Sequence, residues 1–207
     1  MVKKEKIDLF RQLKSRDYLA SGTPALVKTG EGRYLTVEGK GAPGGEDFNR
    51  KIGALYGVAY TIKMTRKYAG EQDYVVGKLE AQWWSDSKSE DFGNLPPEKW
   101  RWKLMIRTPG FVEQKELESA VSVLLEKKKD QAVKEIKLET IAEGQCVQML
   151  HVGPYEEERK SVERMKAFAE EQGLKFSGLH HEIYISDPRR VPPKQLKTIL
   201  RIPVSRL

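Results

Sequence analysis

The sequence predicts an α+β protein made of two similar modules, each with the order strand, helix, strand, strand. Three observations support this prediction. The same order of elements can be read twice along the chain, a glycine-containing turn follows a strand early in each copy, and a glutamate (Glu80 or Glu182) lies in a later strand of each copy. Because internal repeats report architecture, we expect the two copies to face each other and to share a central cleft.

The first copy is indicated by a switch between strand-like and helix-like patterns. Apolar residues recur at helical spacing after a glycine-rich turn at 39–45, and strand-like segments lie on both sides of that helix. The predicted elements are strand 34–38, helix 46–66, strand 74–84, a polar loop at 85–99 and strand 100–107.

The second copy has the same order with shorter connections. Its helix begins after Gly153-Pro154 and ends at Gly173, which is typical helix punctuation. The predicted elements are strands 135–140 and 146–151, helix 155–172, and strands 180–186 and 198–204.

Two further helices complete the predicted organisation. Residues 3–20 carry apolar side chains on one side of a helix, and leucines at helical spacing predict a helix between the copies. We therefore divide the chain into an N-terminal helical arm and one domain with three parts. The boundaries are 1–24 for the arm and 25–207 for the domain, with module one at about 25–112, a bridging helix at about 113–130 and module two at about 131–207.

Composition narrows the class of protein. With 207 residues, of which 39% are hydrophobic, the chain can bury a real core. The net charge of +7 suggests nucleic-acid binding, but Lys and Glu alternate from 113 to 139, which is typical of a solvated helix face. The sequence lacks an apolar membrane span and the apolar core of a secretory signal, so we expect a cytoplasmic protein without a membrane partner.

Strand alternation identifies the candidate site. Glu182 shares a face of its strand with His180 and Tyr184, while His181 and Ile183 face the other way. We expect the apolar set to lie under the helix and Glu182 to lie on the face turned away from it.

The same alternation rule groups Glu80 with Trp84 in the first copy. Trp102 is a further candidate for the wall of the cleft, and Tyr56 on the first helix and Tyr155 at the start of the second are candidate hydroxyl donors. The alternative for each of these residues is ordinary packing, and for Glu182 a solvated edge of the sheet.

A carboxylate among aromatic walls suits two tasks. It can neutralise a lipophilic cation that also contacts aromatic faces, or it can accept a proton from water as a general base. The residues alone leave both open. His180 and Glu182 also suggest a metal site, but His151 would have to converge with them from another strand, so we expect neither a metal nor a cofactor.

Two segments resemble a known family. The run from His181 to Arg190, followed by Leu196 to Val204, resembles the C-terminal signature of the GyrI-like small-molecule-binding family. The segment from Arg33 to Gly41 resembles the opening strand of its stand-alone members. The resemblance implies a pair of SHS2 modules related by a pseudo-twofold axis. The cleft along this axis receives lipophilic or cationic compounds, and Glu182 is the central glutamate.

The resemblance also implies a function. In this family the domain is often fused to a DNA-binding helix-turn-helix, and the segment before Tyr34 is too short for one, so we expect no direct DNA binding. Some stand-alone members are similar to hydrolases that open cyclopropane rings in DNA-alkylating natural products, a detoxification role. There Glu182 would activate water, and Tyr155 or Tyr56 would donate to the phenolate oxygen that develops.

Two alternatives to the hydrolase remain. One is a multidrug-binding protein that sequesters compounds unchanged, and the other is an interaction protein that inhibits a nucleic-acid enzyme such as DNA gyrase. The sequence leaves open the ligand, the identity of the tyrosine donor and the oligomeric state.

Overall fold

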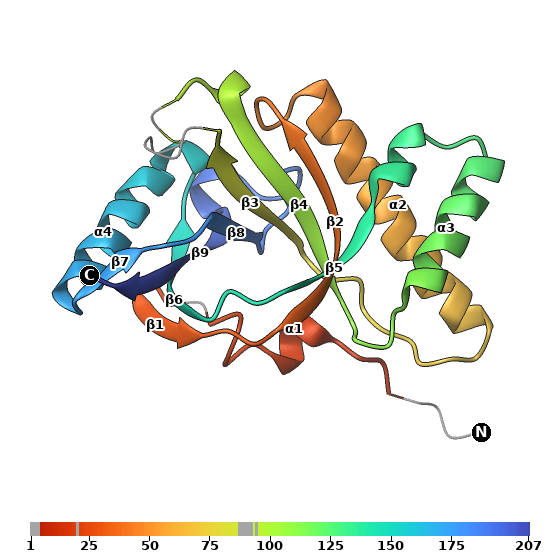
Figure 1. Ribbon diagram of the computed structural model, residues 1–207, viewed down its shortest axis with the longest axis horizontal. Helices are drawn as coiled ribbons and strands as arrows, with labels where there is room; N and C mark the ends of the chain where they lie inside the picture. Colours follow the sequence, from red (N-terminus) through yellow and green to blue (C-terminus); the bar gives the residue numbers. More distant parts are fainter. Residues whose placement is uncertain (1–4, 20, 87–92, 94) are drawn as a thin grey trace.

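The computed structural model describes residues 5–19, 21–86, 93 and 95–207 (Figure 1). Residues 87–92 and 94 of the predicted loop 85–99, and the ends of the predicted helix 3–20, fall outside these residues. The strands are β1 (Ala25–Lys28), β2 (Gly32–Lys40), β3 (Leu79–Ser85), β4 (Trp100–Thr108), β5 (Lys137–Ile141), β6 (Gln145–Val152), β7 (Leu174–Phe176), β8 (His180–Tyr184) and β9 (Lys197–Arg206). The α-helices are α1 (Leu9–Gln12), α2 (Glu46–Tyr68), α3 (Gln114–Glu126) and α4 (Glu158–Glu171).

The strands form one sheet in the order β1-β6-β9-β8-β3-β4-β2-β5, and β7 pairs with β9. All of these pairings are antiparallel. β3 and β8, one from each half of the chain, lie side by side in the middle of the sheet. The predicted α+β class is therefore confirmed.

At each edge of the sheet, the outermost strand pairs with a strand from the other half of the chain. β1 pairs with β6, and β5 pairs with β2, with Leu35 opposite Leu138. β1 and β7 are short strands that the sequence analysis did not predict. At four and three residues they carry too little alternation to stand out from a loop.

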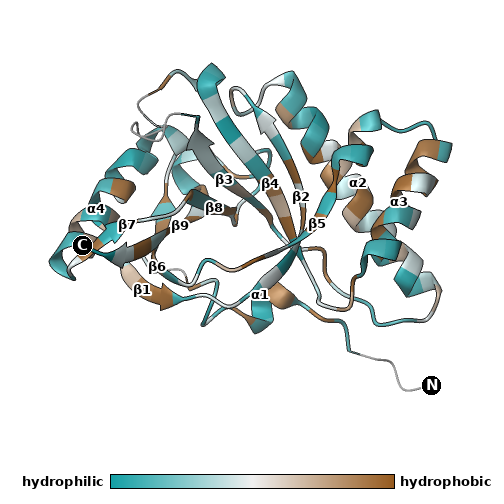
Figure 2. Ribbon diagram, in the orientation of Figure 1, coloured by the Kyte–Doolittle hydropathy of each residue, from teal (hydrophilic) through white to brown (hydrophobic). Residues whose placement is uncertain are grey.

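Helices α2 and α4 cover the same face of the sheet and flank its central strands (Figure 1). α2 buries Leu55, Val58 and Ile62 in a core with β2 and β4. α4 packs Met165 against Leu200 of β9 in a second core. Helix α3 adds its apolar stripe to the first core, and Figure 2 shows how hydrophobic residues run along the strands and helices of this part of the molecule. No helix in the described part of the chain is long and apolar enough to cross a membrane.

The N-terminal segment covers the opposite face of the sheet, and it is much less helical than predicted. Among residues 5–19, only Leu9–Gln12 forms an α-helix. Beyond it, Asp17 and Tyr18 turn into the molecule, where Asp17 pairs with Arg107 at 2.5 Å and the Tyr18 hydroxyl donates to Glu80 at 2.7 Å. The backbone N–H groups of Asp17 and Tyr18 still donate to the Leu13 carbonyl, at 2.9 and 3.2 Å, while their side chains make these buried contacts.

A buried ion network continues from these contacts across the face. His181 lies between Glu80, at 3.0 Å from its Nε2, and Glu143, at 2.9 Å from its Nδ1. Arg201 donates to Glu143 at 2.8 Å and to Gln148 at 2.7 Å. Opposite charges therefore alternate through the network, as buried charges require.

The stability of the protein should fall as pH rises from neutral to about 9. Burial opposes the charge on His181, but the Glu143 and Glu80 carboxylates outweigh it and raise the pKa of His181 from its ordinary 6.5 to about 9. The folded protein therefore holds this proton more tightly than the unfolded chain does. The stabilisation is complete below pH 6.5 and is lost through about pH 9.

Urea unfolding measured at intervals across this pH range tests the prediction. A His181→Gln variant should be less stable throughout and should show a shallower pH dependence in the same range. Equal slopes for both proteins would mean that another group causes the loss.

Candidate functional site

A large cavity opens between α2 and α4, with the central strands β3 and β8 as its floor. Its volume is about 2690 Å³, several times that of an ordinary small-molecule pocket. Each half of the chain thus supplies one helical wall, because α2 follows β2 and α4 follows β6. The cavity is lined by aromatic and ionisable side chains that include Phe48, Tyr56, Trp83, Trp100, Tyr155, Glu158, His180, Glu182 and Tyr184.

Strand pairing explains which side chains reach this cavity. Glu182 lies opposite Ala81 of β3 and opposite Leu200 of β9. Ala81 belongs to the core under α2, and Leu200 belongs to the core under α4. Because paired residues share a face, Glu182 is on the helix-covered face of the sheet. The prediction that it faces away from the helix was therefore wrong.

Glu182 is held by its neighbours on β8. The Tyr184 hydroxyl donates to Glu182 Oε2 at 2.7 Å, and His180 Nε2 lies 3.1 Å from Glu182 Oε1. Burial and the Glu182 charge raise the pKa of Tyr184 well above its ordinary value, so its proton stays on the hydroxyl. The carboxylate is thus oriented while remaining at the cavity, which brings together three residues that the sequence predicted.

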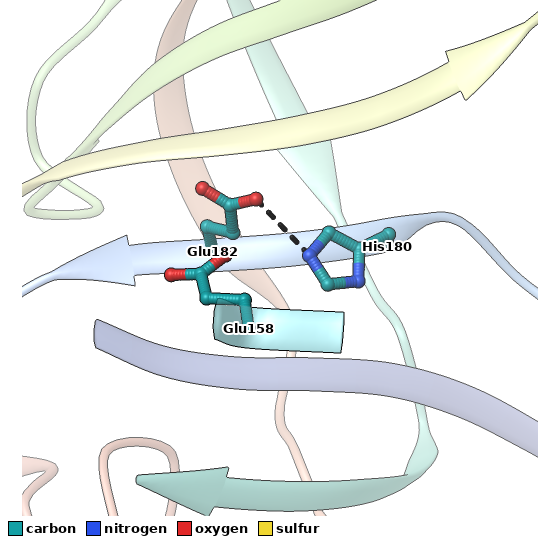
Figure 3. A group of neighbouring side chains, drawn as sticks. All are labelled: Glu158, His180 and Glu182. Carbon is teal, nitrogen blue, oxygen red and sulfur yellow. Dashed lines mark hydrogen bonds and ion pairs between the residues drawn. The ribbon is translucent and has the colours of Figure 1, made fainter. Parts of the chain in front are cut away.

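Glu158 is the site residue that the sequence analysis missed. It is the first residue of α4, and its carboxyl group lies beside Glu182 (Figure 3). One donor atom from each of Glu158, His180 and Glu182 lies within 4.8 Å of the others. Glu158 follows Glu156 and Glu157 directly, so the sequence contained no signal to show which of the three carboxylates turns inward.

The environment of Glu158 favours its neutral form. The residue is 7% exposed, and its Oε1 has no hydrogen-bond partner among the described residues. Burial, followed by the nearby charge of Glu182, raises the pKa of Glu158 well above its ordinary value. The cavity therefore contains one carboxyl group that is bonded and accessible and another that favours a proton.

Tyr155 lies next to this cluster. Its ring meets that of Tyr184 edge to face, with centroids 6.0 Å apart, and the side chain is partly exposed. Burial and the charges of Glu158 and Glu182 raise the pKa of Tyr155 to about 12, so its hydroxyl keeps its proton at neutral pH. Tyr56 lines the cavity from α2 and stacks on Tyr60, with ring centroids 6.1 Å apart.

The aromatic wall is formed by Phe48, Trp83 and Trp100. Trp83 stacks on Phe48, with centroids 5.8 Å apart, and meets Trp100 edge to face at 5.9 Å. Trp83 pairs with His180 across the strands and so shares the face of Glu182. Trp84, which was predicted for this role, borders the cavity. It is adjacent to Trp83 in β3, so the two side chains leave the strand on opposite faces.

Two predicted ligand-binding residues lie elsewhere. Glu80 pairs with Ile183, so it faces the opposite side of the sheet, where it bonds to Tyr18 and His181. Trp102 is fully buried in the core, with its ring edge-on to Phe48 at 5.0 Å. The prediction that both glutamates line one cleft was wrong because a shift of one residue in a strand moves a side chain to the other face. That the site works without a metal or cofactor stays a prediction.

Comparisons with known proteins concern the fold of the whole chain. The sequence matches the model of the GyrI-like small molecule binding domain over residues 23–205. A crystal structure of an uncharacterized conserved protein from Listeria innocua is similar with a TM-score of 0.90, at 41% identity over 97% of this chain and all of that chain. A structure of a hydrolase from Listeria innocua is similar with a TM-score of 0.86, at 39% identity and the same coverage.

The C-terminal domain of EcmrR has the same fold at low sequence identity. It has a TM-score of 0.57 at 13% identity, over 89% of this chain and 98% of that chain, so it shares the fold alone. No curated protein matches the sequence. The match of the family model over most of the chain shows that this protein belongs to the GyrI-like family of small-molecule-binding domains.

Proposed function

We propose that this protein binds bulky, planar, hydrophobic or cationic compounds in the cavity between α2 and α4, and that it hydrolyses cyclopropanoid DNA-alkylating compounds there. One observation carries the proposal: a buried carboxylate, Glu182, is oriented by Tyr184 and His180 inside an aromatic cavity. The similarity to solved structures named as hydrolases, at 39% identity, favours an enzyme over a passive binder.

The chemistry of the substrate makes a single buried base sufficient. A cyclopropane conjugated to a dienone is strained and electrophilic, and its opening restores an aromatic ring. Water attacks a ring CH₂, a C–O bond forms, and the cyclopropane C–C bond breaks. Its electron pair moves through the dienone to the carbonyl oxygen, which becomes a phenolate. The product differs from the substrate by one water.

Each protein group has a defined part in this proposal. Glu182 accepts the proton that water loses, since its oxygens are accessible from the cavity and held in place. Tyr155 donates a hydrogen bond to the phenolate oxygen as its charge develops, and Tyr56 is the second candidate. Trp83 and Trp100 contact the planar ring system, which exploits the large apolar area of their side chains.

The test is incubation of the purified protein with a cyclopropyl-dienone alkylator, followed by mass spectrometry. We expect rapid appearance of a product heavier by one water, in excess over the amount of protein. Buffer alone and heat-denatured protein measure the spontaneous reaction. A compound recovered unchanged would contradict the hydrolase.

A passive binder is the second candidate, and the same cavity favours it. Carboxyl groups beside aromatic faces also suit a lipophilic cation, with each cation–aromatic contact contributing about 0.5–2 kcal/mol. Quenching of tryptophan fluorescence by a compound that is recovered unchanged would support this candidate over the enzyme, because Trp83 and Trp100 line the cavity.

A further inference from the structure

The carboxyl pair formed by Glu158 and Glu182 contains a buried oxygen atom without a hydrogen-bond partner among the described residues. This atom is Oε1 of Glu158, a residue that is itself buried. Two basic residues that line the cavity are paired with other carboxylates: Arg159 lies 3.2 Å from Glu163, and Arg189 lies 2.9 Å from Asp187. The carboxyl pair therefore lies in a cavity whose nearby arginines are already paired.

Two carboxyl groups this close in a buried site do not both ionise readily. Ionising the second places like charges within a few ångströms, where water screens them poorly, so the pair retains one proton over a wide pH range. A cation delivered by a ligand reverses this balance. It places a further positive charge beside the pair and lowers the cost of the second ionisation.

We propose that the Glu158–Glu182 pair is a cation site at which one positive charge of a planar aromatic ligand replaces one bound proton. This inference rests on the proposed binding function and adds to it a coupling to pH for the cationic ligands of that function. Affinity for such a cation rises with pH while the pair still holds its proton, and affinity for a neutral compound of the same shape does not.

The groups around Glu158 are consistent with this assignment. Glu182, His180 and Tyr184 face it from β8, and Thr198 from β9. On its own side of the cavity, Glu156 and Tyr155 precede it in the chain. His151 of β6 lies opposite Thr198 in the sheet, and it is engaged by Ser161 at 3.0 Å and by the Pro154 carbonyl at 3.1 Å. Burial and Glu182 raise the pKa of Glu158, as a proton-holding group requires.

The experiment compares N-methylacridinium, a planar fixed-charge cation, with acridine as its neutral counterpart. Isothermal titration calorimetry at a series of pH values, each in two buffers of different ionisation enthalpy, counts the protons released on binding and gives the pH dependence of the affinity. The protein is first treated with a chelator and dialysed, so that adventitious metal ions do not contribute. We expect close to one proton released per N-methylacridinium and none per acridine, with cation affinity rising by up to roughly tenfold per pH unit.

Variants assign the proton. Glu158→Gln should bind the cation without releasing a proton and with little pH dependence, whereas Glu171→Gln, an exposed change near the end of the same helix, should behave as wild type. Proton release that persists in Glu158→Gln would overturn the assignment.

The remaining outcomes separate the two proposals. N-methylacridinium that binds without proton release, or acridine that binds while the cation does not, would overturn the exchange and leave the binding function intact. Failure of both compounds to bind would overturn the proposed binding of planar aromatic compounds, and the exchange with it.

Discussion

Replacement of Glu182 by glutamine should slow hydrolysis of a cyclopropyl dienone by about 10²–10⁴ and leave binding of the neutral substrate nearly unchanged. The amide has the shape of the carboxylate and still accepts a hydrogen bond from Tyr184 through its oxygen. It cannot accept the proton that water must lose. Single-turnover mass spectrometry measures the rate, and tryptophan quenching measures binding.

Glu171→Gln is the matched control for this variant, because it makes the same chemical change at an exposed position of α4. It should hydrolyse at the wild-type rate. A wild-type rate in Glu182→Gln would show that another group takes the proton. Equal losses of rate and of binding would instead show that Glu182 holds the substrate and does not act as the base.

The second large effect concerns stability. Glu143→Gln should lower the free energy of unfolding by about 3–5 kcal/mol, because it removes one charge from a buried network and leaves its partners uncompensated. Glu143 lies between β5 and β6, within 2.9 Å of His181 and 2.8 Å of Arg201. These two cations hold the pKa of Glu143 well below its ordinary value against the opposing effect of burial.

Urea unfolding followed by circular dichroism measures this loss. Glu171→Gln should change the free energy of unfolding by no more than about 0.5 kcal/mol, since it is exposed and away from the network. A small change in Glu143→Gln would mean that the network rearranges or admits water. His181 and Glu182 are neighbours on β8, so we also expect the loss of Glu143 to loosen the strand that positions the candidate base.

Much of the local structure was predicted correctly from the sequence. The pattern of apolar residues identified α2, where the helix begins at Glu46 as predicted, and strand β4 from Trp100. Alternation along β8 correctly grouped Glu182 with His180 and Tyr184, and the structure confirms that they contact one another. These features depend on neighbours within a few residues, so the sequence by itself determined them.

What alternation cannot supply is the side of the sheet that a helix covers. It showed which residues share a face, but the partner strands decide which face is buried under α2 and α4. Glu182 lies opposite Ala81, and Glu80 therefore faces the N-terminal segment. The same limit applies to Glu158, which turns inward only because α4 starts where it does. The sequence determined the α+β class, the main elements and the grouping of Glu182 with His180 and Tyr184. The tertiary structure decided which side chains meet in the cavity, because strand register and helix placement depend on contacts between distant residues.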